Sequence, residues 1–377
     1  MKIAIVYDYM LQMGGGERVV KALHEIFPDA PIYTVAYDPR ALPEAFQAMD
    51  IRTSFIDRLP LARRKFEIYI PLYAFAMEQF DLREYDVVLS VSTMVAKGAI
   101  TGPRTCHISL CFTPMRWAWD LYQDYVEELR DARLVRWLFR FWTHYYRIWD
   151  ISSASRVNYF IAGSHVAARR IRKHYGRESE VVYPPIDGHF FQSNGAPPED
   201  FYLVVSRLVY AKRVDVAVRA FANLDRRLVV IGQGDRLPHL KRIATSNVEF
   251  LGYQPDEVVR DYYARCRALV FPGEEDFGLT PVEAQAAGRP VIAYAAGGSL
   301  ETIVDGETGV FFDPQTPEAL AEAVEKFETL EFDSSAIRAH VLRFRPETFE
   351  RRIQELVSRC HEEYVAMFFQ RSGPDHS

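Results

Sequence analysis

The stretch from Leu269 to Gly298 constrains the fold of this 377-residue chain more than any other segment. An apolar run from Ala268 to Phe271 leads into it and ends at a Pro-Gly pair, as a buried strand of a parallel sheet ends. A helical pattern opens near Thr280, with a proline in its first turn, where proline is well tolerated. A second strand, Pro290 to Tyr294, follows. We therefore expect strand, loop, helix and strand in an α/β fold.

Two glutamates of this stretch, Glu275 and Glu283, are candidates for ligand binding. They lie eight residues apart, across the loop and the start of the helix. Each carboxylate can accept two hydroxyl hydrogen bonds, and N–H groups at a helix start suit a phosphate or sugar oxygen. The pattern indicates a polyhydroxylated ligand that carries phosphate. The alternative is that both glutamates are solvated surface charges.

The run EDFGLTPVEAQAAG, followed by a strand and a Gly-Gly turn, resembles the signature of retaining nucleotide-sugar glycosyltransferases, group 1 (family 4). The resemblance implies the GT-B fold, an α/β fold with two Rossmann-like domains facing a cleft and a C-terminal helix that returns to the first domain. It also implies that Glu275 lies beside the donor sugar as a catalytic residue and that Glu283 holds the nucleotide ribose. Further donor-binding candidates in the run are Phe277, Gly278, Leu279 and Thr280.

Two cations follow the predicted strand from Phe201 to Ser206. Cations at the exit of a first strand are well placed to meet a diphosphate, which arginine can bind bidentately. The family pattern R-L-x3-K is matched residue for residue, and the resemblance implies that Arg207 and Lys212 hold the donor phosphates and act in catalysis. The alternative is a solvated basic turn.

Two more segments complete the predicted donor site. The strand from Leu228 to Ile231 leads into Gly232-Gln233-Gly234, which matches the glycine turn that lies below the nucleotide in the family. The strand and turn from Val248 to Tyr253 face the base in relatives, so the resemblance implies that Tyr253 binds the donor.

In the first half of the chain, the strand from Ile3 to Tyr7 runs into a glycine-rich segment and then a helix predicted from Val19 to Ile26. Gly15 and Gly16 are donor-binding candidates, because glycines at the carboxyl end of a strand let a ligand approach the backbone. Val19 replaces the third glycine of a dinucleotide fingerprint, which argues against a nicotinamide cofactor. The alternative is a tight turn without a ligand.

The run CFTPMRWAWD, Cys111 to Asp120, resembles a run in bacterial members of the family, many of them mannosyl- and related transferases. Phe112 stands where those relatives carry histidine, so the role of that position here is in doubt. The resemblance makes Phe112 and Arg116 acceptor-side candidates and favours GDP-mannose as donor. His107, five residues earlier on the strand, should point to the other face, and we interpret it as structural.

A basic and aromatic helix is predicted from Arg130 to Trp149. Its arginines and one histidine recur at steps of three and four residues and so form one stripe; they are Arg133, Arg136, Arg140, His144 and Arg147. Such a helix either lies in the interface of an anionic membrane or packs its apolar side on its own domain and turns its arginines to water.

Proline and glycine between Tyr183 and Pro198 predict a linker. We therefore expect an acceptor-side domain over residues 1–190, joined by the C-terminal helix 346–369, and a donor-binding domain over residues 196–345. The tail, residues 370–377, is predicted to be disordered.

Composition narrows the function further. A hydrophobic content of 49% and a charged content of 25% are typical of a soluble globular protein. The net charge of −6, without a long basic run, argues against nucleic acid as a partner. The four cysteines are widely spaced and form no metal or redox motif, so we expect them reduced and mostly buried. No uncharged run approaches the ~18 residues that span a bilayer. We expect a cytoplasmic protein, which is peripheral on the inner face of the cell membrane if the basic helix lies in the membrane interface.

The predicted reaction transfers a sugar from a nucleotide-diphosphate sugar to a hydroxyl of a glycan or lipid-linked acceptor, with retention of configuration. No D-x-D pattern occurs, so we expect neither a metal ion nor a cofactor besides the nucleotide-sugar co-substrate. Two alternatives remain: a GT-B phosphorylase or epimerase, and an inactive GT-B scaffold protein. The intact Arg207, Lys212, Glu275 and Glu283 argue against the scaffold, while Phe112 argues for it.

Overall fold

The structure, a computed structural model, describes residues 1–191 and 197–370. It divides into two compact units, one comprising Met1–Pro184 and Phe349–Ser377 and the other Pro185–Thr348. The first break lies inside the predicted linker, and the second lies in the first turn of the C-terminal helix. Residues 192–196 of the predicted linker and 371–377 of the predicted tail lie outside the described residues.

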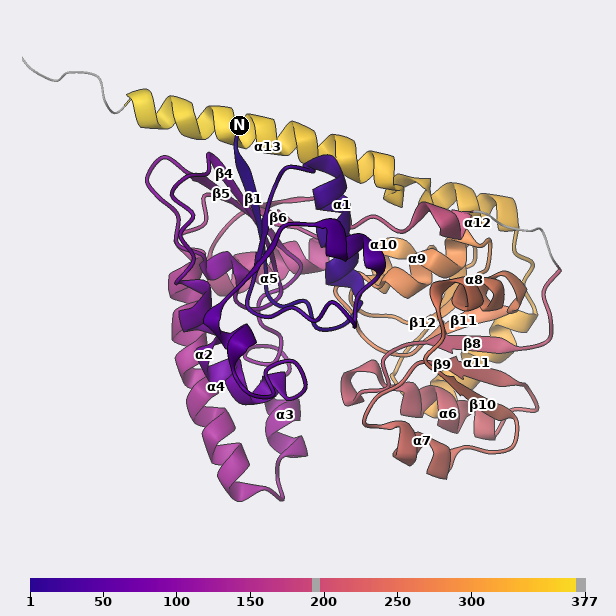
Figure 1. The fold of residues 1–377 in the computed structure, drawn as a ribbon. Coiled ribbons are helices and arrows are strands. Elements are labelled where there is room, and N and C mark those ends of the chain that lie inside the picture. Colours follow the sequence, from indigo (N-terminus) through magenta and orange to yellow (C-terminus); the bar gives the residue numbers. More distant parts are fainter. Residues whose placement is uncertain (192–196, 371–377) are drawn as a thin grey trace, which may run out of the picture. The chain divides into compact units, whose positions relative to one another are not determined.

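Unit 1 is built on a parallel sheet in the order β3-β2-β1-β4-β5-β6-β7 (Figure 1). Its strands are β1 (Ile3–Tyr7), β2 (Ile32–Thr34), β3 (Ile51–Thr53), β4 (Val87–Ser92), β5 (Cys106–Cys111), β6 (Tyr159–Ala162) and β7 (Ser179–Val181). The central strands β1, β4 and β5 are buried along their whole length, as expected for parallel strands with helices on both faces. The range of β1 is the predicted one.

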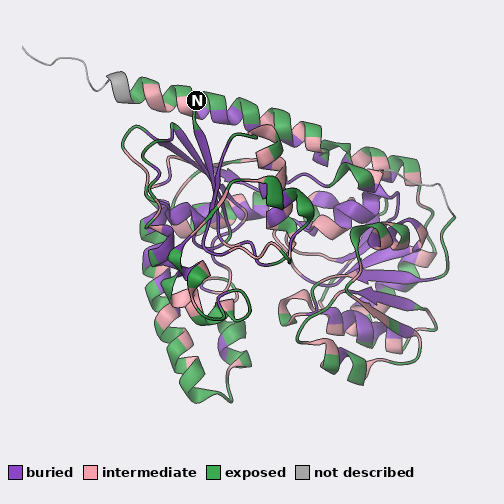
Figure 2. Cartoon of the chain, in the orientation of Figure 1, coloured by how far each residue is buried: buried purple, intermediate pink, exposed green. Residues whose placement is uncertain are grey.

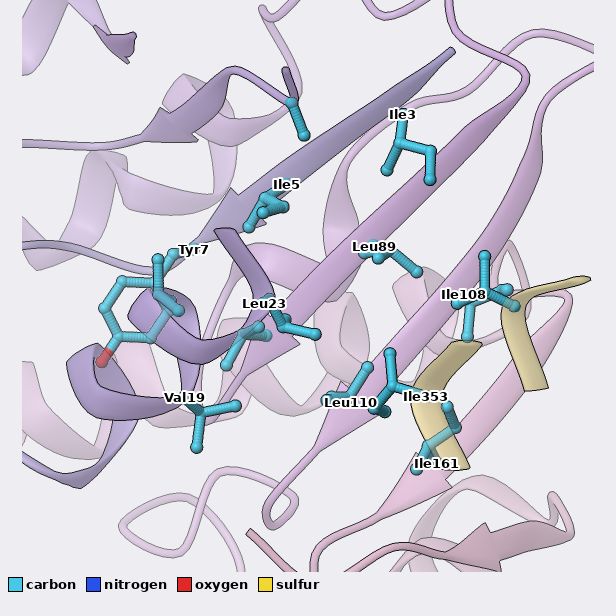
Figure 3. Close-up of a cluster of buried hydrophobic side chains, with 14 of the residues drawn as sticks. Ile3, Ile5, Tyr7, Val19, Leu23, Leu89, Ile108, Leu110, Ile161 and Ile353 are labelled. Carbon is cyan, nitrogen blue, oxygen red and sulfur yellow. The ribbon is translucent and has the colours of Figure 1, made fainter. Parts of the chain in front are cut away.

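Helices cover this sheet. They are α1 (Gly15–Ile26), α2 (Ile70–Met77), α3 (Tyr122–Glu128), α4 (Arg133–Ala154), α5 (His165–Tyr175) and α13 (Pro346–Gln370). Figure 3 shows Val19 and Leu23 of α1 and Ile353 of α13 packed against the apolar side chains of the strands. The prediction that the C-terminal helix returns to the first domain is therefore confirmed. Ser164 caps α5, since its hydroxyl accepts a hydrogen bond from the N–H of Ala167 at 3.0 Å.

The sequence from Asp57 to Phe80 favours a helix, but no continuous helix forms there. The segment forms two 3-10 turns, Phe55–Arg58 and Phe66–Tyr69, before the short helix α2. The residue before Pro60 is extended, as a residue before proline tends to be. Leu61 then takes a left-handed conformation, with φ of 60°. The two residues together interrupt the helical pattern.

Unit 2 holds a second parallel sheet in the order β10-β9-β8-β11-β12-β13. Its strands are β8 (Tyr202–Val205), β9 (Leu228–Ile231), β10 (Val248–Gly252), β11 (Ala268–Phe271), β12 (Val291–Tyr294) and β13 (Gly309–Phe312). Its helices are α6 (Val214–Ala222), α7 (Leu237–Ile243), α8 (Asp256–Arg265), α9 (Leu279–Ala286), α10 (Ser299–Thr302), α11 (Pro317–Glu328) and α12 (Ser334–His340). In each unit the strand order reverses beside the first strand, which creates a switch point between β1 and β4 and another between β8 and β11.

Candidate functional site

The switch point of unit 2 gathers the predicted phosphate-binding and sugar-binding residues. Strands β8 and β11 are direct neighbours, and their carboxyl ends continue into the loops 206–213 and 272–278. Open α/β sheets bind ligands at this place, because the two loops diverge there and leave backbone groups accessible. The sheet topology therefore brings the R-L-x3-K segment beside the E-x7-E segment.

Lys212 and Glu275 meet across this switch point. The ammonium of Lys212 forms an ion pair with the Glu275 carboxylate, and their side chains are only 20% and 26% exposed. Arg207 lies in the same loop as Lys212, directly after the half-buried Ser206, and its side chain is exposed. The alternative of a solvated basic turn therefore does not describe Lys212, although Arg207 does face solvent.

Gly232 and Gly234 pack against the loop that carries Arg207. A Cβ on Gly232 would press against the carbonyl oxygen of Ser206, and one on Gly234 would press against that of Leu208. The N–H of Leu208 also donates to the carbonyl of Gln233 at 2.9 Å. Glycine is required here because two backbone segments approach closely. The predicted place of this turn below the nucleotide stays a prediction.

The Gly-Gly turn after β12 supports Glu275 in the same way. The N–H of Gly298 donates to the carbonyl of Glu275 at 2.7 Å, and a Cβ on Gly297 would press against that carbonyl. In the sequence, this glycine pair stands out only as part of the family signature. The close backbone contact gives it a physical role, because it fixes the loop from which the Glu275 side chain projects.

Helix α9 begins at Leu279, one residue before the predicted start near Thr280. Its N-cap, Gly278, has a φ of 84° and no side chain that could cap the helix. The first N–H groups of a helix lack partners within the helix, which suits an anion. Phe277 is buried and packs edge-on against Phe344, with ring centroids 5.3 Å apart, so its side chain belongs to the core of unit 2.

Glu283 lies in the second turn of α9 and is only 4% exposed. Its carboxylate accepts a hydrogen bond from the Tyr263 hydroxyl of α8 at 3.0 Å. The alternative that Glu283 is a solvated surface charge is therefore wrong.

Tyr253, the predicted base-facing residue, follows β10 and is exposed.

The corresponding switch point of unit 1 is occupied by a side chain of the protein itself. Asp8 follows β1, is buried, and accepts hydrogen bonds of 2.6–2.9 Å from the N–H groups of Thr93, Met94, Val95 and Ala96 after β4. Burial raises the pKa of Asp8, while these N–H groups oppose that rise. The backbone that could hold a phosphate in unit 1 thus holds a carboxylate, which leaves the unit 2 switch point as the candidate nucleotide site.

The predicted boundary of the first helix needs correction. Helix α1 begins at Gly15, so Gly15 and Gly16 form its first turn and do not lie in a loop ahead of Val19. A Cβ on Gly16 would press against the ring and hydroxyl of Tyr7, and that hydroxyl donates to the buried Glu17 at 3.1 Å. Tertiary packing therefore overrides the weak helix propensity of glycine. Whether a donor also approaches these glycines stays a prediction.

The acceptor-side candidates follow β5. The half-buried Phe112 packs on Gly163, where a Cβ would lie 2.6 Å from the ring, and Arg116 is half-buried in the next turn. His107 is buried with Nε2 2.9 Å from the Ser90 hydroxyl, and burial lowers its pKa to about 3. His107 is therefore neutral and structural, as predicted. Trp119, near the end of the run, donates from its indole to the buried Asp150.

Three further findings bear on the expected class of protein. All four cysteines are free and buried, as predicted. Over residues 1–191 and 197–370, no group of three or more His, Cys, Asp or Glu side chains is placed to hold a metal ion. Within those same ranges, no helix is both long enough and apolar enough to cross a lipid bilayer.

Comparison with known proteins identifies the second unit. The family described as "Glycosyl transferases group 1" matches residues 186–340. A D-inositol 3-phosphate glycosyltransferase of Nocardiopsis dassonvillei is 32% identical over 197 residues, which are 43% of this chain and 45% of that protein. A GDP-mannose-dependent alpha-(1-6)-phosphatidylinositol monomannoside mannosyltransferase of Mycolicibacterium smegmatis is 33% identical over 138 residues, 32% of this chain and 36% of that protein. The chain thus matches less than half the length of these relatives.

The whole described fold has a counterpart among crystal structures. Anabaena HepE in complex with UDP aligns with a TM-score of 0.69 over 95% of this chain and 100% of that chain, at 18% identity. This likeness concerns the fold alone. Residues 186–340 therefore match the glycosyl transferases group 1 family, and the chain as a whole has the GT-B fold.

Proposed function

We propose that the chain is a retaining glycosyltransferase that moves a sugar from a nucleotide-diphosphate sugar to a hydroxyl of a glycan or a lipid-linked acceptor. The observation that carries the proposal is the pairing of Lys212 with Glu275 at the switch point of unit 2. Arg207 on the same loop and the buried Glu283 of α9 complete the set that the family signature requires.

The proposed chemistry uses these side chains without a metal ion or a cofactor. Arg207 and Lys212 bind the donor diphosphate, whose oxygens replace Glu275 as the anionic partner of Lys212. The bond between the anomeric carbon and the phosphate oxygen breaks while the acceptor oxygen bonds to that carbon on the same face. The acceptor proton passes to the leaving phosphate. Both cations stabilise the negative charge that grows on this phosphate.

For the donor we propose GDP-mannose. Two observations support this choice: the resemblance of the run from Cys111 to Asp120 to mannosyltransferases, and the GDP-mannose-dependent relative from Mycolicibacterium smegmatis. The structural neighbour HepE was crystallised with UDP, so a UDP-sugar is the competing donor.

A thermal-shift panel of GDP-, UDP- and ADP-sugars tests the proposal. A ligand at about 100 times its Kd adds roughly 2.7 kcal/mol of stability, which shifts the melting temperature measurably. We expect the largest shift in melting temperature with GDP-mannose. We also expect slow hydrolysis of that donor, and an α-configured transfer product in NMR spectra. Absence of a shift with every nucleotide sugar would contradict the proposal. Binding without hydrolysis or transfer would indicate the scaffold, and a requirement for inorganic phosphate would indicate the phosphorylase.

A further inference from the structure

Helix α4 buries one side and exposes an apolar ridge on the other. Its buried residues are Thr143, Tyr146, Trp149, Asp150, Ser153 and Ala154. The ridge consists of Leu134, Trp137, Phe141 and Ile148, which recur at helical spacing and are 55–70% exposed. Figure 2 shows α4 exposed over most of its length. The alternative in which the helix packs its apolar side on its own domain therefore does not describe this ridge.

The ridge belongs to a firmly held helix. Asp150 forms a buried ion pair with Lys97 and accepts a hydrogen bond from the Trp119 indole at 2.8 Å. Nearer the N-terminus of α4, Phe139 packs against Tyr122 and Tyr125, with distances of 6.0 Å between ring centroids. Because Phe139 lies on the side of α4 opposite Trp137, α3 and its carboxylates lie away from the ridge.

Three arginines and a histidine line one flank of the ridge. Arg133, Arg140 and His144 are exposed and Arg136 is half-buried, all within one helical stripe. Asp150 is the sole carboxylate of α4, and it is buried. The exposed side of α4 therefore presents apolar and positively charged groups together.

Residues 55–75 extend the exposed apolar surface on the flank of the ridge that lies opposite the basic residues. The Tyr146 hydroxyl donates to the carbonyl of Ile70, and the Trp149 indole donates to Glu78 at 2.8 Å, so α2 lies beside α4 (Figure 1). Exposed apolar side chains of this segment are Phe55, Leu61, Ile68, Leu72 and Phe75. Leu61 is 54% exposed. Its backbone is left-handed, a conformation that costs a leucine about 1–2 kcal/mol. Arg58, Arg64 and Lys65 are exposed in the same segment.

We propose that the α4 ridge and the exposed side chains of residues 55–75 form one surface that docks on an anionic lipid bilayer. Aromatic and aliphatic side chains bordered by arginine and lysine suit the boundary between headgroups and acyl chains. Contiguous exposed apolar patches mark interaction sites. A second copy of the chain fits less well, because a two-fold contact would bring the same arginines towards one another. The inference does not depend on the donor.

Co-sedimentation of the full chain with vesicles tests this surface without any nucleotide. The probes are vesicles of phosphatidylcholine alone and vesicles with about 30% phosphatidylglycerol. We expect binding to the anionic vesicles that weakens as salt rises. Arg136→Glu with Arg140→Glu should reduce the partition coefficient at least about 30-fold, since each cation near the surface contributes about a factor of five. Leu61→Ser with Leu72→Ser should reduce it about tenfold.

The matched control reverses two exposed charges elsewhere in unit 1. Arg169→Glu with Lys173→Glu, both on α5, should leave most of the binding intact. Circular dichroism and melting temperature establish that each variant is folded. The proposal is overturned if the chain ignores anionic vesicles, or if the α4 and α5 variants lose binding equally. It is also overturned if light scattering shows a dimer that Trp137→Ser dissociates while vesicle binding is unchanged.

Discussion

The ammonium of Lys212 and the carboxylate of Glu275 form an ion pair between the loops that follow β8 and β11. Close backbone contacts of glycines hold both loops in place. Gly232 and Gly234 contact the loop after β8, and Gly297 and Gly298 contact the loop after β11. The ion pair is therefore carried by two loops that are held in place at the switch point. An anionic donor that reaches Lys212 competes with Glu275 for it.

Removal of either cation of the β8 loop should affect catalysis more than donor binding. The donor diphosphate is charged in the ground state, but negative charge on the leaving phosphate increases as the glycosidic bond breaks. An interaction that strengthens along the reaction raises kcat. We expect Arg207→Ala and Lys212→Ala each to lower kcat on the order of 10²–10³-fold, with a smaller rise in the KM for the donor. Steady-state kinetics with saturating donor measures both.

Two further variants make this test specific. Arg207→Lys should recover only part of the activity, because an ammonium cannot reproduce the bidentate fork of a guanidinium. Lys241→Ala, which removes an exposed cation from α7, should leave kcat unchanged. If kcat survives in the Arg207 and Lys212 variants and only KM rises, these residues merely dock the nucleotide.

Glu283 should contribute to nucleotide binding and to stability through different atoms. Glu283→Ala should cost about 1.5–3 kcal/mol of donor binding, and it also removes the acceptor of the Tyr263 hydroxyl, at about 1–3 kcal/mol of stability. Glu283→Gln keeps an acceptor for Tyr263 but weakens hydrogen bonds from the ribose. Tyr263→Phe is the matched control, since it should lower stability and spare nucleotide affinity. If calorimetry gives all three variants the nucleotide affinity of the unmutated protein, Glu283 does not belong to the site.

Gly232→Ala should distort the loop that carries Arg207. Gly232 has a φ of 136°, and an added Cβ would press on the Ser206 backbone, so we expect a loss on the order of 3 kcal/mol or more in unfolding free energy. Gly306→Ala is a control with a positive φ of 77° but open space around the added Cβ, and it should cost only about 1–2 kcal/mol. Urea unfolding compares them. Equal losses would mean that the contact with Ser206 is unimportant.

His107 should make stability depend on pH. Burial lowers its pKa to about 3, whereas the unfolded chain titrates near its ordinary value of about 6.5. Between these values the unfolded state binds a proton that the folded state does not, so stability falls as pH decreases. The loss approaches about 1.4 kcal/mol per pH unit. His107→Gln should remove this component, measured as the difference between the two proteins in urea unfolding at about pH 7 and about pH 5. Parallel pH profiles would contradict the assignment.

Buried parallel strands were the most predictable elements. The bounds of β1, β9 and β11 are the predicted ones, because each is an uninterrupted apolar run with polar or turn residues at its end. The spacing of Glu275 and Glu283 and the R-L-x3-K segment also predicted the family that residues 186–340 match, since a short motif can be recognised from its residue types alone. The site residues of unit 2 could thus be chosen before any contact was known.

The sequence by itself therefore determined the strand–helix alternation, the family match of residues 186–340 and the choice of candidate donor residues. The tertiary structure alone decided which groups are paired or exposed: it joins Lys212 to Glu275, buries Glu283 against Tyr263, and places Asp8 at the switch point of unit 1. It also decided the side on which α4 packs. The physical reason is that local patterns depend on neighbours in the chain, whereas burial and pairing depend on residues that meet only after the sheets form. The periodicity of a helix that is apolar on most sides cannot reveal which side its own domain covers.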